Sequence, residues 1–218
     1  MSDAGVDNQI IEVASLPPKR NVLIQRAFLF EYVTLAWMII EATVAIASGL
    51  LANSLVLVAF GIDSAIELAS AAVLVWRLNV ELRQGQSYAE EAEKAASRIG
   101  GALLFLLAAY VVAAAGWKLW TRQGAEFSLL GFSVSLLAIP IMYVLSRRKL
   151  ELAQQLGSRA LRADAVESIT CGWLAFVVVA ALAAQLLFGA WWVDAIASLA
   201  IVYFLIREGR EAWKGEEY

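Results

Sequence analysis

The stretch SLVLVAFGIDSAIELASAAVLVW, residues 54–76, decides the fold because it is apolar for almost its whole length. A helix needs about 20 such residues to cross the hydrocarbon core of a bilayer. Similar apolar stretches lie elsewhere in the chain, at 28–48, 99–117, 127–145, 165–188 and 191–206. Because they are continuously apolar rather than alternating, they predict helices and not the strands of a barrel. We therefore expect an all-α integral membrane protein with six transmembrane helices.

The composition of the chain favours the same class of protein. Of its 218 residues, 61% are hydrophobic and only 17% are charged, whereas soluble domains contain about 45–50% apolar and about 25% charged residues. The formal net charge of −3 argues against a nucleic-acid partner, which requires a basic face. The absence of histidine excludes histidine-based catalysis, and a single cysteine, Cys171, excludes a disulfide framework.

Basic residues are unevenly distributed between the apolar stretches. They concentrate before the first stretch, in alternate connecting segments and after the last stretch, and only Lys118 and Arg122 lie in the other segments. The positive-inside rule therefore predicts that both termini are cytoplasmic. We expect residues 1–26 to form a cytoplasmic arm, residues 27–207 the membrane domain and residues 208–218 a short cytoplasmic tail.

Acidic residues lie inside or beside the apolar stretches, whereas we expect no lysine or arginine deep in any of them. These acidic residues are Glu41, Asp63, Glu67, Asp164, Glu167 and Asp194. A charged side chain at the centre of a membrane helix costs about 2.5–3.5 kcal/mol on insertion scales. Acids without matching bases predict that the carboxyls are protonated or that a bound cation supplies the missing charge.

The spacing of these residues indicates a metal site. Asp63 and Glu67 are four residues apart, as are Glu167 and Cys171, so each pair shares one face of its helix. Three carboxylates and a thiolate from two facing helices suit a tetrahedral divalent ion such as Zn²⁺. The carboxylates would also accept Mn²⁺ or Fe²⁺.

Other acidic residues allow two interpretations at this stage. Asp164 is a secondary candidate ligand that could equally form a surface ion pair with nearby arginines. Glu41, the other secondary candidate, could instead form a hydrogen bond between helices. For Asp194 we favour a helix N-cap at the membrane interface over metal ligation, and we expect Glu31 to be interfacial.

Three segments resemble the second, fifth and sixth spans of cation diffusion facilitator (cation efflux) transporters. They are NSLVLVAFGIDSAIELASAAVLVWRL at 53–78, ALRADAVESITCGW at 160–173 and WWVDAIASLAIVYFLIREGREAW at 191–213. The resemblance extends over essentially all of residues 20–213. It implies six spans, both ends in the cytoplasm, a homodimer, and a central metal site at Asp63 with Glu67 and at Glu167 with Cys171.

The chain also departs from the pattern of that family. Glu167 stands where the family has a histidine, and Cys171 stands where it has a second acid. The family's usual cytoplasmic C-terminal domain is missing, so we expect a short form.

These features together predict a secondary transporter. We expect it to export a divalent metal in exchange for protons by alternating access. Zn²⁺ is the first candidate for this metal, and Cd²⁺, Fe²⁺, Mn²⁺ and Co²⁺ are the others. We expect no enzymatic activity and no prosthetic group, and we expect it in a lipid bilayer, specifically the bacterial inner membrane. The alternatives are a proton-coupled organic-cation exporter and, more weakly, a metal-dependent intramembrane enzyme, because no basic residue that could hold phosphate is expected deep in the spans.

Overall fold

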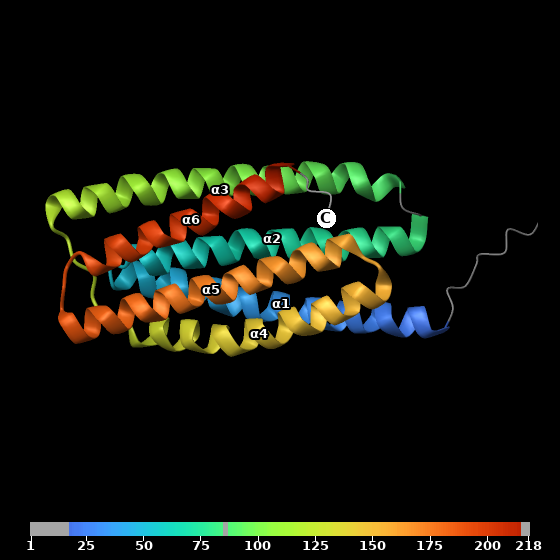
Figure 1. Ribbon diagram of the computed structural model, residues 1–218, viewed down its shortest axis with the longest axis horizontal. Helices are drawn as coiled ribbons and strands as arrows, with labels where there is room; N and C mark the ends of the chain where they lie inside the picture. Colours follow the sequence, from blue (N-terminus) through green and yellow to red (C-terminus); the bar gives the residue numbers. More distant parts are fainter. Residues whose placement is uncertain (1–17, 85–86, 215–218) are drawn as a thin grey trace, which may run out of the picture.

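The computed structural model describes residues 18–84 and 87–214, which form helices and no strand. The helices are α1 (Pro18–Leu51), α2 (Leu55–Gln84), α3 (Ser87–Thr121), α4 (Leu129–Leu156), α5 (Arg159–Phe188) and α6 (Val193–Lys214). They run side by side along the long axis of one elongated bundle (Figure 1). The predicted all-α fold is confirmed. The first 17 residues of the predicted arm and residues 215–218 of the predicted tail lie outside the described residues, and α1 begins within the predicted arm.

Five of these helices contain segments long and apolar enough to cross a membrane. The segments are Val22–Leu51, Leu55–Val73, Gly101–Thr121, Leu129–Leu156 and Asp164–Phe188. The remaining helix, α6, carries Asp194 in its first turn and charged residues from Arg207 onward, so its apolar part is shorter. It nevertheless packs against α3, α2 and α5 within the same bundle.

Helices α4 and α5 begin and end with the same capping features. Ser128 accepts a hydrogen bond from Gly131 N before α4, and Ser158 accepts one from Leu161 N before α5. A serine at this position provides an acceptor for an otherwise unpaired backbone N–H of the first turn. Each of the two helices ends at a glycine in the left-handed conformation, Gly157 after α4 and Gly189 after α5, with φ of 63° at Gly157. A residue without Cβ adopts this conformation at no steric cost.

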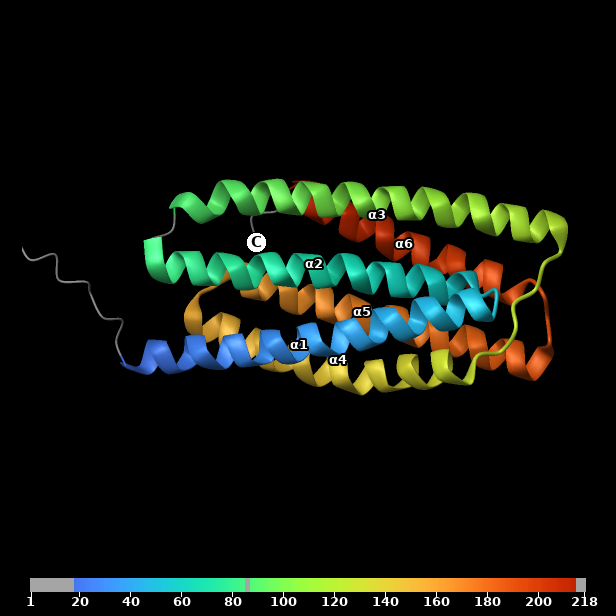
Figure 2. The ribbon, with the colours of Figure 1, turned by 180° about the vertical axis from the view of Figure 1, so that it is seen from behind.

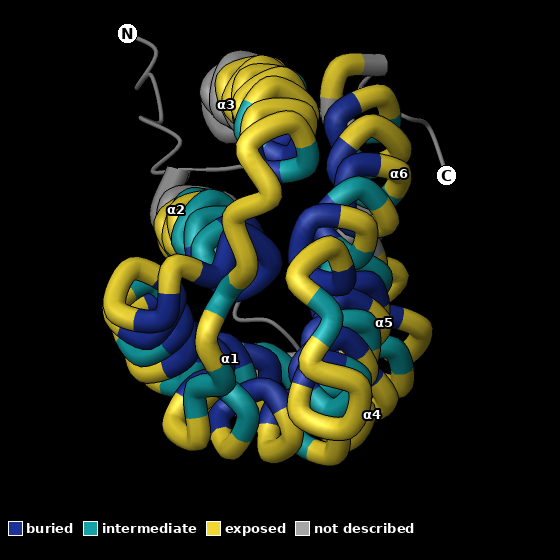
Figure 3. The backbone as a smooth tube through the Cα atoms, turned by 90° about the vertical axis from the view of Figure 1, so that its left-hand side faces the viewer, coloured by how far each residue is buried: buried dark blue, intermediate teal, exposed yellow. Residues whose placement is uncertain are grey.

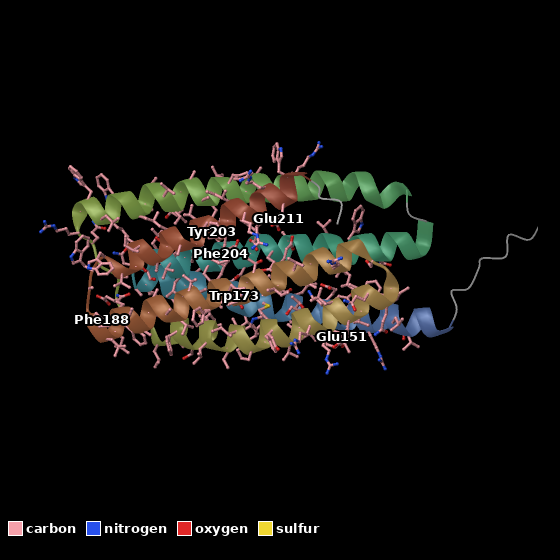
Figure 4. All side chains as sticks on the ribbon, viewed as in Figure 1. Glu151, Trp173, Phe188, Tyr203, Phe204 and Glu211 are labelled. Atoms are coloured by element: carbon pink, nitrogen blue, oxygen red, sulfur yellow. The ribbon has the colours of Figure 1, made fainter. Side chains whose placement is uncertain are left out.

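Helices α2 and α5 lie against each other inside the bundle. Helix α1 packs against α2 and α4, α4 packs against α5, and α3 packs against α6 and α2. Viewed along the bundle, buried faces turn inward and exposed faces turn outward (Figure 3). Large apolar side chains on the outward faces are well exposed, including Trp173 (58%), Phe188 (76%) and Tyr203 (66%), which Figure 4 labels. Such a surface is stable against lipid rather than water.

Helices α1 and α2 converge at the end where the chain passes from one to the other and separate toward the opposite end (Figure 2). Two glycines allow this close approach. A Cβ on Gly49 would lie 2.8 Å from Val58 N, and a Cβ on Gly61 would lie 2.8 Å from Ile46 N. Gly61 precedes Asp63 by two residues, so this packing fixes the part of α2 that carries the acidic pair.

Candidate metal site

The two predicted pairs lie on helices that touch. Asp63 and Glu67 belong to α2, Glu167 and Cys171 belong to α5, and α2 packs against α5. Asp63 is 3% exposed and Cys171 is 1% exposed, while Glu67 and Glu167 are partly buried. The fold therefore brings the two pairs to one interface.

The side chains do not form a closed coordination sphere. Within residues 18–84 and 87–214, no three Asp, Glu, Cys or His side chains are grouped so that they could hold a metal ion. Glu67 Oε1 is buried and has no hydrogen-bond donor in that part of the chain. A buried acceptor without a donor carries its full desolvation cost, so this oxygen is available to a proton or a cation.

Glu41 on α1 contacts the same interface. It is fully buried, and its Oε1 accepts hydrogen bonds from Ser64 Oγ at 2.7 Å and from Cys171 Sγ at 3.3 Å. Its Oε2 accepts a hydrogen bond from Trp37 Nε1 at 2.6 Å. Of the two interpretations open from the sequence, the structure shows the hydrogen bond between helices.

A buried lysine corrects the expectation that no basic residue lies deep in a span. Lys149 lies within the apolar segment of α4, is fully buried, and donates to Glu31 Oε2 at 3.1 Å. It also forms an ion pair with Asp164 on α5. Glu31 is therefore buried in an ion pair rather than interfacial. Asp164 is paired in the interior, not at the surface with the nearby arginines.

The sequence does contain a signal for this lysine. Ala138, Met142, Leu145 and Lys149 follow one another at intervals of three or four residues and are all buried. This spacing marks the inward face of a helix. The positive-inside rule instead groups Lys149 with the basic residues of the segment that follows the apolar stretch at 127–145.

Asp194 joins three helices at the opposite end of the bundle. Its carboxylate accepts hydrogen bonds from Ser54 Oγ at 2.6 Å and Leu55 N at 2.8 Å, and forms an ion pair with Lys118 at 3.1 Å. Asp194 therefore caps a helix N-terminus, as predicted. Asp194 caps the N-terminus of α2, although it lies in the first turn of α6.

Comparison with known proteins places the chain in a family. Residues 32–215 match the cation efflux transmembrane domain. Because this match covers most of the chain, the protein belongs to the cation efflux, or cation diffusion facilitator, family of metal cation transporters. It is an integral multi-pass membrane protein. No curated protein sequence matches the chain significantly.

Proposed function

We propose that the chain is a secondary transporter that exports a divalent transition-metal cation, foremost Zn²⁺, from the cytoplasm in exchange for protons. The observation that carries this proposal is a difference between two groups of membrane acids in the described residues. Glu31, Glu41, Asp164 and Asp194 each have a protein donor or ion-pair partner. The buried lysines Lys118 and Lys149 pair with Asp194, Glu31 and Asp164, and not with Asp63, Glu67 or Glu167. Glu67 Oε1 and Glu31 Oε1 are both buried without a donor, but the other oxygen of Glu31 accepts from Lys149. A carboxylate that is wholly or partly buried without a basic partner favours a proton or a cation.

The proposed ligands are Asp63 and Glu67 from α2 with Glu167 and Cys171 from α5. Metal from the cytoplasm displaces protons from these groups, because carboxyl and thiol ligands bind metals in their deprotonated forms. A rearrangement of the helices then exposes the site to the other side, where protons displace the metal. Competition of metal and proton for the same lone pairs is a sufficient basis for antiport. Because the ligands are not gathered in this conformation, metal binding draws the side chains of α2 and α5 together.

The ligand types support Zn²⁺ or Cd²⁺ over the other divalent ions. A thiolate favours these metals, while three carboxylates also accept Mn²⁺, Fe²⁺ or Co²⁺. In this proposal the metal is cargo and the protein holds no prosthetic group. By analogy with its family, we propose that the transporter works as a homodimer, and we place it in the bacterial inner membrane.

Flux measurements in proteoliposomes with an imposed pH gradient test this function. We expect the wild-type protein to move Zn²⁺ only when the gradient is present, and Asp63→Ala to abolish this flux because it removes a carboxylate ligand. Glu151→Ala is the matched control, since Glu151 is a carboxylate on α4 whose side chain is 58% exposed. Transport by Asp63→Ala at the wild-type rate would refute the site. Movement of organic cations but no metal by the wild-type protein would refute the function.

A further inference from the structure

The Lys149 network, formed by Glu31, Lys149 and Asp164, contains one more carboxyl group than it has basic groups. Lys149 Nζ lies 3.1 Å from Glu31 Oε2 and also forms an ion pair with Asp164. A single ammonium group balances the charge of only one carboxylate. With both carboxyls ionised, the network would hold an uncompensated negative charge in the interior of the bundle, which is costly.

The other charged groups around Glu31 do not balance this charge. On α1, α4 and α5, the arginines near this end of the bundle whose side chains are described are exposed, namely Arg26, Arg147, Arg148 and Arg162. The other buried lysine, Lys118, pairs with Asp194 at the opposite end. The remaining membrane acids on α1, α2 and α5 can only add negative charge, and they are Glu41, Asp63, Glu67 and Glu167.

The surroundings of the network do not solvate the charge either. One turn nearer the end where α1 begins (Figure 1), buried apolar side chains from the same three helices pack together, namely Ala27, Leu152, Ala153 and Leu161. One turn nearer the middle of the bundle lie three buried hydroxyl groups, those of Thr34, Ser146 and Ser168. Each of these hydroxyls donates to a carbonyl oxygen of its own helix. A hydroxyl has only one hydrogen to donate, so none of the three donates to Glu31.

Glu31 offers the place for a compensating proton. Its Oε2 accepts from Lys149, whereas its Oε1 is buried and has no hydrogen-bond partner among the described residues. The side chain of Asp164 is 6% exposed and that of Glu31 is fully buried, so the negative charge costs less on Asp164. A metal ion would need several ligands, and the described residues contain no group of three Asp, Glu, Cys or His side chains that could bind one. A proton needs a single lone pair.

We propose that Glu31 is a proton-binding site of the folded protein, separate from the candidate metal site. At neutral pH a proton from solvent forms an O–H bond at Glu31 Oε1, while Lys149 and Asp164 remain ionised. The network then carries no net charge, because one ammonium group faces one carboxylate. This inference goes beyond the proposed function and does not depend on it, since neither of its tests uses a metal.

Infrared spectra of the detergent-solubilised protein at neutral pH test this site directly. A protonated carboxyl shows a carbonyl stretch that a carboxylate lacks. The difference between the wild-type protein and Glu31→Gln should contain one such band, and the band should shift when glutamate, but not aspartate, is labelled with ¹³C in its side-chain carboxyl. Asp164→Asn should lose the same band, because Glu31 then pairs with Lys149 as a carboxylate. Glu151→Gln, at an exposed carboxylate, is the control and should keep it.

Three infrared results would overturn the proposal. They are the absence of the band from the difference spectrum, a band that does not shift with labelled glutamate, and a band that persists in Asp164→Asn.

The pH dependence of unfolding provides a second measurement. Glutamate in an unfolded chain is ionised at neutral pH, so the wild-type protein releases the Glu31 proton when it unfolds, and its stability falls as the pH rises. Each such proton makes the equilibrium constant for unfolding rise about tenfold per pH unit. We expect Glu31→Gln and Asp164→Asn each to remove one proton's worth of this slope around neutral pH, and Glu151→Gln to retain it. Equal slopes in the wild-type protein and the first two variants would overturn the proposal.

Discussion

Lys149 places an ammonium group between two carboxylates in the interior of the bundle. Its side chain and that of Glu31 are fully buried, and that of Asp164 is 6% exposed. Such an arrangement adds little net stability, because the desolvation of the charges offsets their attraction. The removal of one partner is costly, since the remaining charges lose their counter-ion.

We therefore expect Lys149→Met to be strongly destabilising. The free energy of unfolding in detergent should fall by about 3–5 kcal/mol, the range for breaking a buried ion pair. The triple variant Glu31→Gln/Lys149→Met/Asp164→Asn should recover much of this loss. Arg148→Met removes an exposed neighbouring charge and is the control. Wild-type stability in Lys149→Met would show that the ion pair does not hold α1, α4 and α5 together.

A second prediction at the residue scale concerns the effect of Cys171 on metal preference. Cys171→Asp replaces the proposed thiolate ligand with an oxygen ligand, so transport should shift from Zn²⁺ or Cd²⁺ toward Mn²⁺. Competition between these ions for flux measures the shift. An unchanged order of preference would remove Cys171 from the set of ligands.

Single residues also show how much the sequence could predict. Four-residue spacing identified both pairs, Asp63 with Glu67 and Glu167 with Cys171, and these pairs lie on α2 and α5, which pack against each other. The spacing of Trp37 and Glu41 on one helix could be predicted, but the partners of Glu31, Glu41 and Asp194 on other helices could not. Helical spacing relates residues within one helix only.

At the scale of elements, the contact of α1 with α2 depends on glycine. A side chain at Gly61 would meet the backbone N of Ile46, which cannot move without shifting α1. Gly61→Ala should therefore push the two helices apart and lengthen the contact between Glu41 and Ser64.

We expect Gly61→Ala to lower the stability by about 1–3 kcal/mol, the usual cost of overpacking, and to reduce transport. Gly116→Ala on α3 is a matched control, because its Cβ would meet no atom within 4 Å and alanine favours a helix. Thermal unfolding in detergent measures both variants. Equal melting temperatures for the two would show that α1 and α2 do not need this close approach.

The lengths of the helices could be predicted less well than their existence. The apolar stretch at 127–145 predicts a span, but α4 continues to Leu156. Hydropathy marks only the part of a helix that contacts lipid, whereas the helix itself continues until a residue such as Gly157 ends it.

At the scale of the whole molecule, two ion-pair networks lie at opposite ends of the bundle. The Lys149 network joins α1, α4 and α5, and the Asp194 network joins α2, α3 and α6. The two groups of helices share no member, and the candidate site lies between them because its ligands come from α2 and α5. A single sequence does not reveal this partition, since the sequence alone does not say which helices are neighbours.

The Asp194 network can be tested through the amides that it caps. In Asp194→Ala, Leu55 N and Val56 N lose the carboxylate that accepts their hydrogen bonds. Hydrogen exchange at the start of α2 should accelerate by about tenfold, corresponding to the loss of about 1.4 kcal/mol of local protection. Exchange near the middle of α4 should be unchanged. Equal protection of α2 in the variant and the wild-type protein would contradict the assigned cap.

The central claim is that metal and protons compete for the same groups between α2 and α5. It is tested most directly by adding Zn²⁺ to the purified protein in weakly buffered detergent at neutral pH while recording the pH. We predict that protons are released in proportion to the metal bound, and that Asp63→Asn/Glu167→Gln releases far fewer. Zn²⁺ binding without proton release, or equal release by that variant, would contradict the account.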